Sequence, residues 1–129
     1  MGMYTEFVLS CQVDERHTEA VNVLKMMAGV GGDMHWERPA HEFFSCDRWM
    51  QLFHSSSHYF TPRSVCLFEY DDISKTWCLI VNSSLKNYSG EIEAFIDWLS
   101  PFLYNELDDM IGYSRYEEDH DPKILRRAR

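Results

Sequence analysis

The sequence predicts an α+β fold of the ferredoxin-like type, a split βαβ order (β-α-β-β-α-β) that gives an antiparallel sheet with two helices on one face. Segments with apolar residues at every second position, which is typical of half-buried strands, alternate with segments whose apolar residues recur at helical spacing. The 129-residue chain has the length of one domain, and 45% of its residues are hydrophobic. This composition is sufficient for an ordinary packed core. Helices that are apolar on one side must cover a sheet, so we expect both on the same face.

The first part of the pattern is a strand followed by a helix. Residues 4–13 alternate between apolar and polar side chains, as expected for a strand with one wet face. Asp14 is expected to open a helix that runs to about Ala28, where a group of glycines ends it. The apolar face of the strand contains Phe7, Leu9, Cys11 and Val13.

The second part of the pattern contains three strands and the clearest helix. Residues 64–70 and 77–85 are predicted strands joined by a polar turn of hairpin length. Ser89 is expected to cap a helix that Pro101 ends or kinks, and residues 109–118 alternate as a last strand. The apolar stripe of this helix consists of Ile92, Phe95, Ile96, Leu99, Phe102 and Leu103.

The organisation of the chain is predicted to be one domain over residues 1–129. Residues 33–62 form an aromatic-rich insertion after the first helix, too apolar for a loose loop. Whether this insertion contains a short helix or a strand is left open by its sequence. Residues 119–129 are highly charged and are expected to form a flexible tail.

The charge of the chain restricts its partners. Lysine and arginine number 12 against 21 aspartate and glutamate residues, for a net charge of −9. Four of the basic residues lie in residues 122–129, so the rest of the chain is more acidic still. Such a surface repels phosphate backbones and anionic lipid, which argues against binding to nucleic acid or to a membrane. A protein partner is expected to be basic.

The compartment is expected to be the cytoplasm. No apolar run approaches the roughly 20 residues that span a bilayer, and the first residues lack the pattern of a signal peptide. The reducing cytosol favours free thiols at the four cysteines. These are Cys11, Cys46, Cys66 and Cys78.

Candidate chemistry is confined to one group of possible metal ligands. The group consists of His41, Cys46, His54 and His58. The sequence lacks the paired-cysteine knuckle of structural zinc sites and the nucleophile pattern of serine hydrolases. We therefore expect no metal, no cofactor and no catalytic residues, and keep a small metal-dependent or cysteine–histidine hydrolase as an alternative.

Two groups of residues are candidates for contact with a protein partner. Acidic residues that together could form one strongly negative surface are Asp108, Asp109, Glu117, Glu118, Asp119 and Asp121. Aromatic residues of the insertion that could anchor a partner if exposed are Trp36, Trp49, Tyr59 and Phe60. Packing of these aromatic residues inside the insertion is the competing interpretation.

Three segments of the chain share a recognisable pattern, namely Leu85-Lys86-Asn87-Tyr88, Glu91-Ile92-Glu93-Ala94-Phe95-Ile96-Asp97-Trp98-Leu99-Ser100-Pro101 and Ile111-Gly112-Tyr113-Ser114-Arg115-Tyr116-Glu117-Glu118. By this pattern, most of the chain resembles a family of small uncharacterised proteins of bacteria and their phages. The resemblance extends to Asp47-Arg48-Trp49 and to Tyr59-Phe60, while Lys123-Ile124-Leu125 before a run of arginines departs from it. The resemblance implies a bacterial or phage origin and no catalytic or binding residues.

These observations favour a non-enzymatic protein-binding module. One form of it is a phage or mobile-element inhibitor that engages a basic host or defence component, as an immunity-type or anti-CRISPR-like protein or a mimic of nucleic acid. The alternatives are the small hydrolase described above and a structural homodimer that associates through a sheet face or edge.

Overall fold

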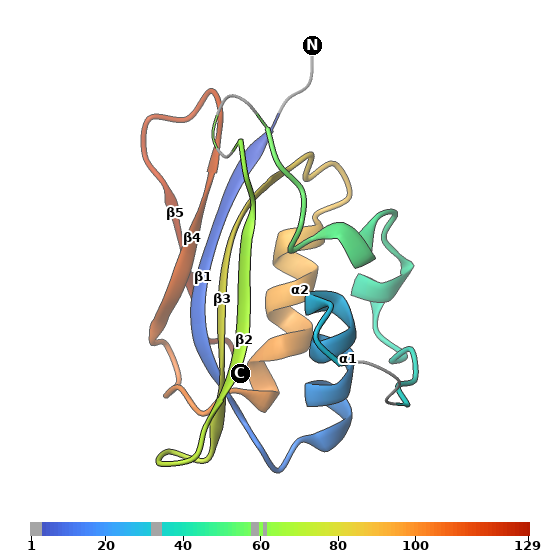
Figure 1. The fold of residues 1–129 in the computed structure, drawn as a ribbon. Coiled ribbons are helices and arrows are strands. Elements are labelled where there is room, and N and C mark those ends of the chain that lie inside the picture. Colours follow the sequence, from blue (N-terminus) through green and yellow to red (C-terminus); the bar gives the residue numbers. More distant parts are fainter. Residues whose placement is uncertain (1–3, 32–34, 58–59, 61) are drawn as a thin grey trace.

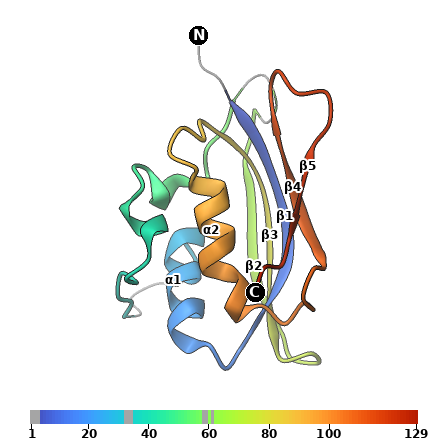
Figure 2. The ribbon, with the colours of Figure 1, turned by 180° about the vertical axis from the view of Figure 1, so that it is seen from behind.

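The computed structural model describes residues 4–31, 35–57, 60 and 62–129. In this part of the chain, five antiparallel strands form one sheet in the order β2-β3-β1-β4-β5. The strands are β1 (Thr5–Asp14), β2 (Val65–Asp71), β3 (Thr76–Leu85), β4 (Met110–Tyr116) and β5 (Lys123–Arg126). Helices α1 (Thr18–Ala28) and α2 (Glu91–Leu99) lie side by side on one face of the sheet (Figures 1 and 2).

The structure confirms the predicted α+β class, the antiparallel sheet and the two helices on one face. The ferredoxin-like arrangement is not confirmed as predicted, because the described residues contain a fifth strand and the sheet order includes it. The additional strand is β5, which pairs with β4 at one edge of the sheet.

The boundary between β1 and α1 lies later than the sequence predicts. Asp14 is the last residue of β1 and α1 begins at Thr18. The carboxylate of Asp14 accepts a hydrogen bond from the backbone N–H of Arg16 and binds its guanidinium group, at 3.0 Å and 2.8 Å. This side-chain turn competes with helical hydrogen bonding, so the helix starts after it. At the other end, Gly29 has the left-handed conformation (φ 78°) that the end of a helix often requires.

The start of α2 is held by Asn87 and Glu91, where the sequence suggested Ser89. The Asn87 amide oxygen accepts a hydrogen bond from the Ile92 N–H at 2.9 Å. The Glu91 carboxylate accepts one from the Ser89 N–H at 2.7 Å, although Glu91 is only 5% exposed. The helix ends at Leu99 and continues as the short 3₁₀ turn η3 (Ser100–Phe102), which is consistent with the expected effect of Pro101.

The insertion contributes to the core through two short 3₁₀ turns, η1 (Glu42–Ser45) and η2 (Trp49–Gln51). They pack beside α2 on the side away from the sheet (Figure 1). The described residues of the insertion supply five apolar side chains that are at most 8% exposed, namely Phe43, Phe44, Trp49, Leu52 and Phe53. The insertion thus forms a third layer, and it covers a side of α2 that would otherwise face water.

Phe95 of α2 connects these layers. Its ring is fully buried and has neighbours in the sheet, in the insertion and on its own helix. The ring centroids of Phe43, Phe53 and Phe7 lie 5.1, 5.4 and 6.4 Å from that of Phe95. Such edge-on and tilted aromatic contacts add to the stabilisation that comes from burial alone.

The prediction of a flexible tail is wrong for residues 123–126, which form β5. Leu125 pairs with Gly112 of β4 and is 4% exposed, so its burial stabilises the strand. Hydrogen bonds beyond the strand also hold this segment, from the Arg127 N–H to the Asp109 carbonyl and from the Ala128 N–H to Ser100 Oγ, both at 2.9 Å. The apolar pair Ile124-Leu125 was overlooked in the sequence because the residues around it are charged.

The two faces of the sheet differ in what covers them. The helices and the insertion cover one face, and no helix of the described residues lies against the other (Figures 1 and 2). Neither α1 nor α2 has the length and apolar character needed to cross a bilayer. Alternation along β1 separates the faces, with Phe7, Leu9, Cys11 and Val13 buried beneath the helices. This confirms the face predicted from the sequence.

Candidate binding groove

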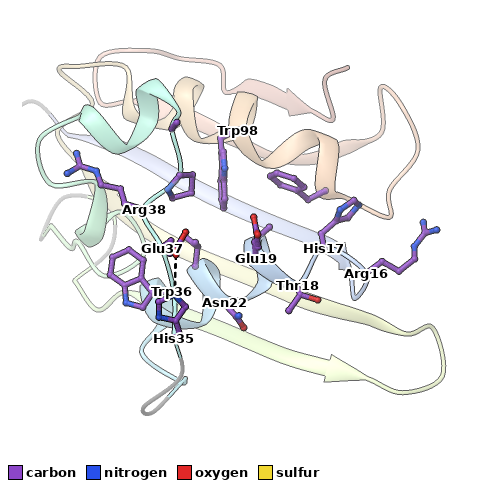
Figure 3. A pocket seen from close by; sticks show the side chains of 15 residues that line it. Arg16, His17, Thr18, Glu19, Asn22, His35, Trp36, Glu37, Arg38 and Trp98 are labelled. Atoms are coloured by element: carbon purple, nitrogen blue, oxygen red, sulfur yellow. Dashed lines mark hydrogen bonds and ion pairs between the residues drawn. The ribbon is translucent and has the colours of Figure 1, made fainter.

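A groove of about 720 Å³ runs between α1, residues 35–40 and the C-terminal part of α2 (Figure 3). This volume lies within the range of pockets that bind small molecules or protein side chains. The lining residues are Arg16, His17, Thr18, Glu19, Ala20, Asn22, Val23, His35, Trp36, Glu37, Arg38, Pro39, Ala40, Trp98 and Phe102.

The floor of the groove is aromatic. Trp98 projects from α2 into the groove (Figure 3) and lies 5.4 Å from the ring of Phe102, between centroids. The Phe102 ring also contacts the imidazole of His17 at 5.2 Å. On its far side Trp98 meets Phe44 of the insertion edge-on at 5.0 Å, so the indole is held in place and is 6% exposed.

The wall formed by residues 35–40 is fixed to the core at two points. Trp36 is half-buried and packs edge-on against Trp49 at 6.1 Å. The Arg38 guanidinium donates a hydrogen bond to the backbone carbonyl of Phe44. These contacts place a second tryptophan at the groove without burying it fully.

The positively and negatively charged side chains of the groove occupy different parts of it. Arg16 is bound by Asp14 and Arg38 by the Phe44 carbonyl, so both guanidinium groups are held by their own chain. Figure 3 shows these arginines at opposite ends of the groove, with Glu19 and Glu37 between them and Glu19 across from Trp98. The described residues give the Glu19 carboxylate no ion-pair partner. Glu37 has only His35, at 3.4 Å and with both side chains more than 80% exposed.

The groove contains two kinds of group that can attract a cation. Aromatic faces attract a positively charged group through their quadrupole, and nearby carboxylates add direct attraction. The same chain already contains such a contact, since Lys25 Nζ lies 4.4 Å from the centre of the Trp77 ring. The lining contains no serine or cysteine that could act as a nucleophile.

The candidate metal ligands that the structure describes do not form a metal site. Within the described residues, no group of three or more histidine, cysteine or acidic side chains could hold an ion. His41 uses both ring nitrogens, since Nδ1 accepts from the Phe43 N–H at 3.0 Å and Nε2 lies 2.9 Å from Asp97. His54 Nε2 is 2.8 Å from the Met27 carbonyl. His58 lies outside the described residues.

Cys46 is placed where a thiolate is disfavoured. It lines a separate hollow with Glu42, Asp47 and Glu93. Burial, followed by the negative charges of Glu91, Glu42 and Asp47, raises the pKa of the Cys46 thiol. A catalytic cysteine requires the opposite environment. The four cysteines are free, as predicted.

The six acidic residues predicted as one surface form two groups. Asp108 and Asp109 precede β4, and the other four residues follow it. Since β4 spans seven residues at about 3.3 Å each, the groups lie at opposite ends of the strand (Figure 1). Asp109 is also used within its own loop, where its carboxylate accepts a hydrogen bond from the Glu106 N–H at 3.0 Å. A single continuous acidic surface is therefore not formed.

The aromatic residues predicted to contact a partner have different positions. Trp49 is 8% exposed and packs against Phe43 and Phe44, so its prediction as an exposed anchor is corrected to a core residue. The guanidinium group of Arg115 lies over the ring of Phe60, with its Cζ atom 4.9 Å from the ring centre. Tyr59 lies outside the described residues. Of the three that the structure describes, Trp36 lines the groove and Trp49 and Phe60 do not.

Sequence reasoning missed Glu19, Glu37, Trp98 and Phe102 as groove residues. Trp98 lies outside the apolar stripe of α2 and would face water if the sheet were its only neighbour. A tryptophan on the polar side of an otherwise amphipathic helix was a usable signal that a further layer covers that side. The position of Glu37 depends on the path of the insertion, for which the sequence has no periodic pattern.

Searches of protein-family models, of curated proteins and of solved structures find no significant match to this chain.

Proposed function

We propose that this protein is a non-enzymatic binding module that engages a basic protein partner and holds a lysine or arginine side chain of that partner in the groove. The observation that carries the proposal is that Glu19 and Glu37 line the same groove as the half-buried Trp36 and the largely buried Trp98. Among the described residues, neither arginine of the groove forms an ion pair with these carboxylates, because Arg16 is paired with Asp14 and Arg38, which keeps its charge, is bound to a backbone carbonyl.

The expected energetics are those of a side-chain anchor. A cation over an aromatic face contributes about 0.5–1 kcal/mol when exposed and about 2 kcal/mol when water is excluded. The net charge of −9 adds long-range attraction, which accelerates encounter with a basic surface. Specificity would come from the rest of the interface and from the fit of the aliphatic part of the side chain against the two tryptophans.

This function does not depend on mimicry of nucleic acid. The acidic residues that would imitate a phosphate backbone lie in two separate groups around β4. We also propose that β1 to β4 with the two helices form a ferredoxin-like unit to which β5 is added. Support comes from the sheet order, because each helix joins two strands that have one antiparallel strand between them.

The proposal is tested by comparing two pairs of substitutions that change the net charge equally. We expect Glu19→Gln with Glu37→Gln to weaken binding of a fluorescein-labelled peptide of alternating lysine and glycine by about tenfold, or 1.4 kcal/mol. Glu117→Gln with Glu118→Gln, outside the groove, should weaken it by no more than about twofold, because these charges act on a peptide in the groove only at long range, where salt screens them. Fluorescence anisotropy in a dilution series measures both.

Two outcomes would contradict the proposal. If both pairs weaken binding equally, the peptide senses only the overall charge of the protein. If neither pair changes binding, the carboxylates of the groove do not contact the lysines. Far-ultraviolet circular dichroism of both variants establishes that each remains folded.

A further inference from the structure

A further hollow lies at the end of the sheet where β1 begins and β4 ends, close to the start of α2 (Figure 1). It has a volume of about 280 Å³ and is here called the polar hollow. This volume is at the lower limit of pockets that bind small molecules, so any occupant must be small. The polar hollow and the groove have no lining residue in common.

Two hydroxyl groups at the polar hollow belong to buried side chains. Thr5 of β1 and Ser114 of β4 line it, and each is 7% exposed. Neither hydroxyl group forms a hydrogen bond to any residue in the described part of the chain. Both side chains lie on the helix-covered face, because Thr5 is on the same side of β1 as Phe7 and Ser114 pairs with Phe7. Polar groups that are withdrawn from bulk water without a partner in the protein indicate a bound water molecule or ligand.

Strand pairing places two more hydrogen-bonding side chains beside these hydroxyl groups. Tyr116 of β4 pairs with Thr5. Lys123 of β5 pairs with Ser114. Directly paired residues share a face of the sheet, and all four of these residues line the polar hollow. A phenol can donate and accept a hydrogen bond, and an ammonium group has three donors.

The segment that leads into α2 adds a carboxylate whose position is fixed. Asn87 Nδ2 donates hydrogen bonds to both carboxylate oxygens of Glu93, at 3.0 and 3.1 Å. The Asn87 amide oxygen accepts the Ile92 N–H at 2.9 Å, so the amide is itself held at the start of the helix. A carboxylate has about four lone-pair sites, and Asn87 occupies two of them. Glu93 therefore keeps acceptor sites at the polar hollow, which it lines together with Asn87.

The combination of groups selects the class of ligand. Every residue that lines the polar hollow has a side chain able to form hydrogen bonds, so an aliphatic ligand would leave them without partners. Lys123 repels a cation, and Glu93 and Asp119 repel an anion. The hydroxyl groups of a sugar both donate and accept, so they can pair with a carboxylate, an ammonium group or another hydroxyl group. The Tyr88 ring, which is 71% exposed, offers an aromatic face for the C–H side of a sugar ring.

We propose that the polar hollow binds a neutral monosaccharide through its hydroxyl groups. Glu93 and Asp119 accept hydrogen bonds from these hydroxyl groups, and Lys123 donates to them. Thr5 and Ser114 donate or accept at the inner end of the hollow, where both are buried. Because the groove is formed by other residues, this inference goes beyond the proposed function, and either one can fail without the other.

Nuclear magnetic resonance with simple sugars tests this proposal. Glucose, galactose, mannose and N-acetylglucosamine are each added to the wild-type chain, and sodium phosphate and methylammonium chloride serve as comparison probes for an anion and a cation. At least one sugar should receive saturation transfer from the protein and displace the backbone amide signals of Thr5 and Ser114. The dissociation constant should be in the millimolar range, since a ligand of this size makes few contacts. No response to any of the four sugars, or a larger displacement of these signals by either ion, would overturn the proposal.

Removal of the two buried hydroxyl groups tests where the sugar binds. Thr5→Val with Ser114→Ala nearly preserves side-chain shape, and it should weaken sugar binding by about tenfold or more. The midpoint of thermal unfolding should stay close to the wild-type value, because neither hydroxyl group has a partner in the described part of the chain. Ser10→Ala, at an exposed position of β1 outside the hollow, is the matched control and should leave sugar binding unchanged. Equal sugar affinity of all three proteins would contradict the assigned site.

Substitution of exposed charges tests the class of ligand and does not disturb the core. Lys123→Gln and Asp119→Asn should each weaken sugar binding by about threefold or more, because charged groups of both signs bond to the sugar. An anion would instead bind more tightly to Asp119→Asn, and a cation more tightly to Lys123→Gln. Unchanged sugar affinity in both variants would overturn the proposal even if Thr5→Val with Ser114→Ala failed to fold.

Discussion

Phe95→Ala is expected to lower the free energy of unfolding by about 3–5 kcal/mol, the usual cost of removing a buried phenylalanine. The ring is fully buried and is surrounded by rings from three different parts of the chain, so its loss leaves a cavity that no single neighbour can fill. Equilibrium unfolding in urea, monitored by tryptophan fluorescence, measures the change.

The matched control is the replacement of an apolar side chain that lies outside the core. Ile73→Ala removes a side chain that is 90% exposed, and it should change stability by less than about 0.5 kcal/mol. A loss below about 1.5 kcal/mol for Phe95→Ala would show that Phe95 does not connect the sheet, α2 and the insertion in the way the structure indicates. Preserved secondary structure with lost near-ultraviolet dichroism would locate the damage in the packing.

Gly112→Ala is expected to destabilise the protein by about 2–3 kcal/mol or more, since the added methyl group has no space. A Cβ atom at this position would lie 3.0 Å from Leu9 Cα and closer still to the Val8 carbonyl oxygen. Both neighbours belong to the backbone of β1, so neither can move without disturbing the pairing of β1 with β4. The irregular register between Met110 and Gly112 on the β5 side shows that the strand is already bent there.

Ser114→Ala is the control for this substitution, because Ser114 lies two residues further along β4 and is also buried. Removal of the Ser114 hydroxyl group should lower the free energy of unfolding by no more than about 1 kcal/mol, the usual contribution of one hydrogen bond. Thermal unfolding of both variants provides the comparison. Equal stability of Gly112→Ala and the wild-type chain would contradict the close approach of β1 and β4.

The regular elements could be predicted because each has a repeating pattern. Alternation in residues 5–14 identifies β1 and its buried face, and the stripe that contains Ile92, Phe95 and Leu99 identifies α2. Boundaries were less accurate where a side chain competes with the backbone, as Asp14 does before α1. β5 was missed because one buried residue, Leu125, stabilises a four-residue strand among charged neighbours.

The groove could not be predicted because it is formed by tertiary packing. Glu19 reads as an ordinary exposed residue of a helix, and Glu37 lies in a segment without periodicity. Glu19 lines the groove with Trp98 because α1 and α2 lie side by side, and Glu37 does so because residues 35–40 pass along the same groove. The candidate group of histidines and a cysteine shows the converse, since closeness in sequence did not bring its described members, His41, Cys46 and His54, together as a metal site.

The position of a bound lysine in the groove tests the proposed function most directly. The four tryptophans give four indole N–H signals in a ¹H–¹⁵N spectrum, each assigned by substitution to phenylalanine. Addition of a short glycine-flanked lysine peptide should displace the signals of Trp98 and Trp36 and leave that of Trp77 in place, while the same peptide with norleucine should displace none. Unchanged Trp98 and Trp36 signals, or equal displacement by the norleucine peptide, would contradict a cation-binding groove.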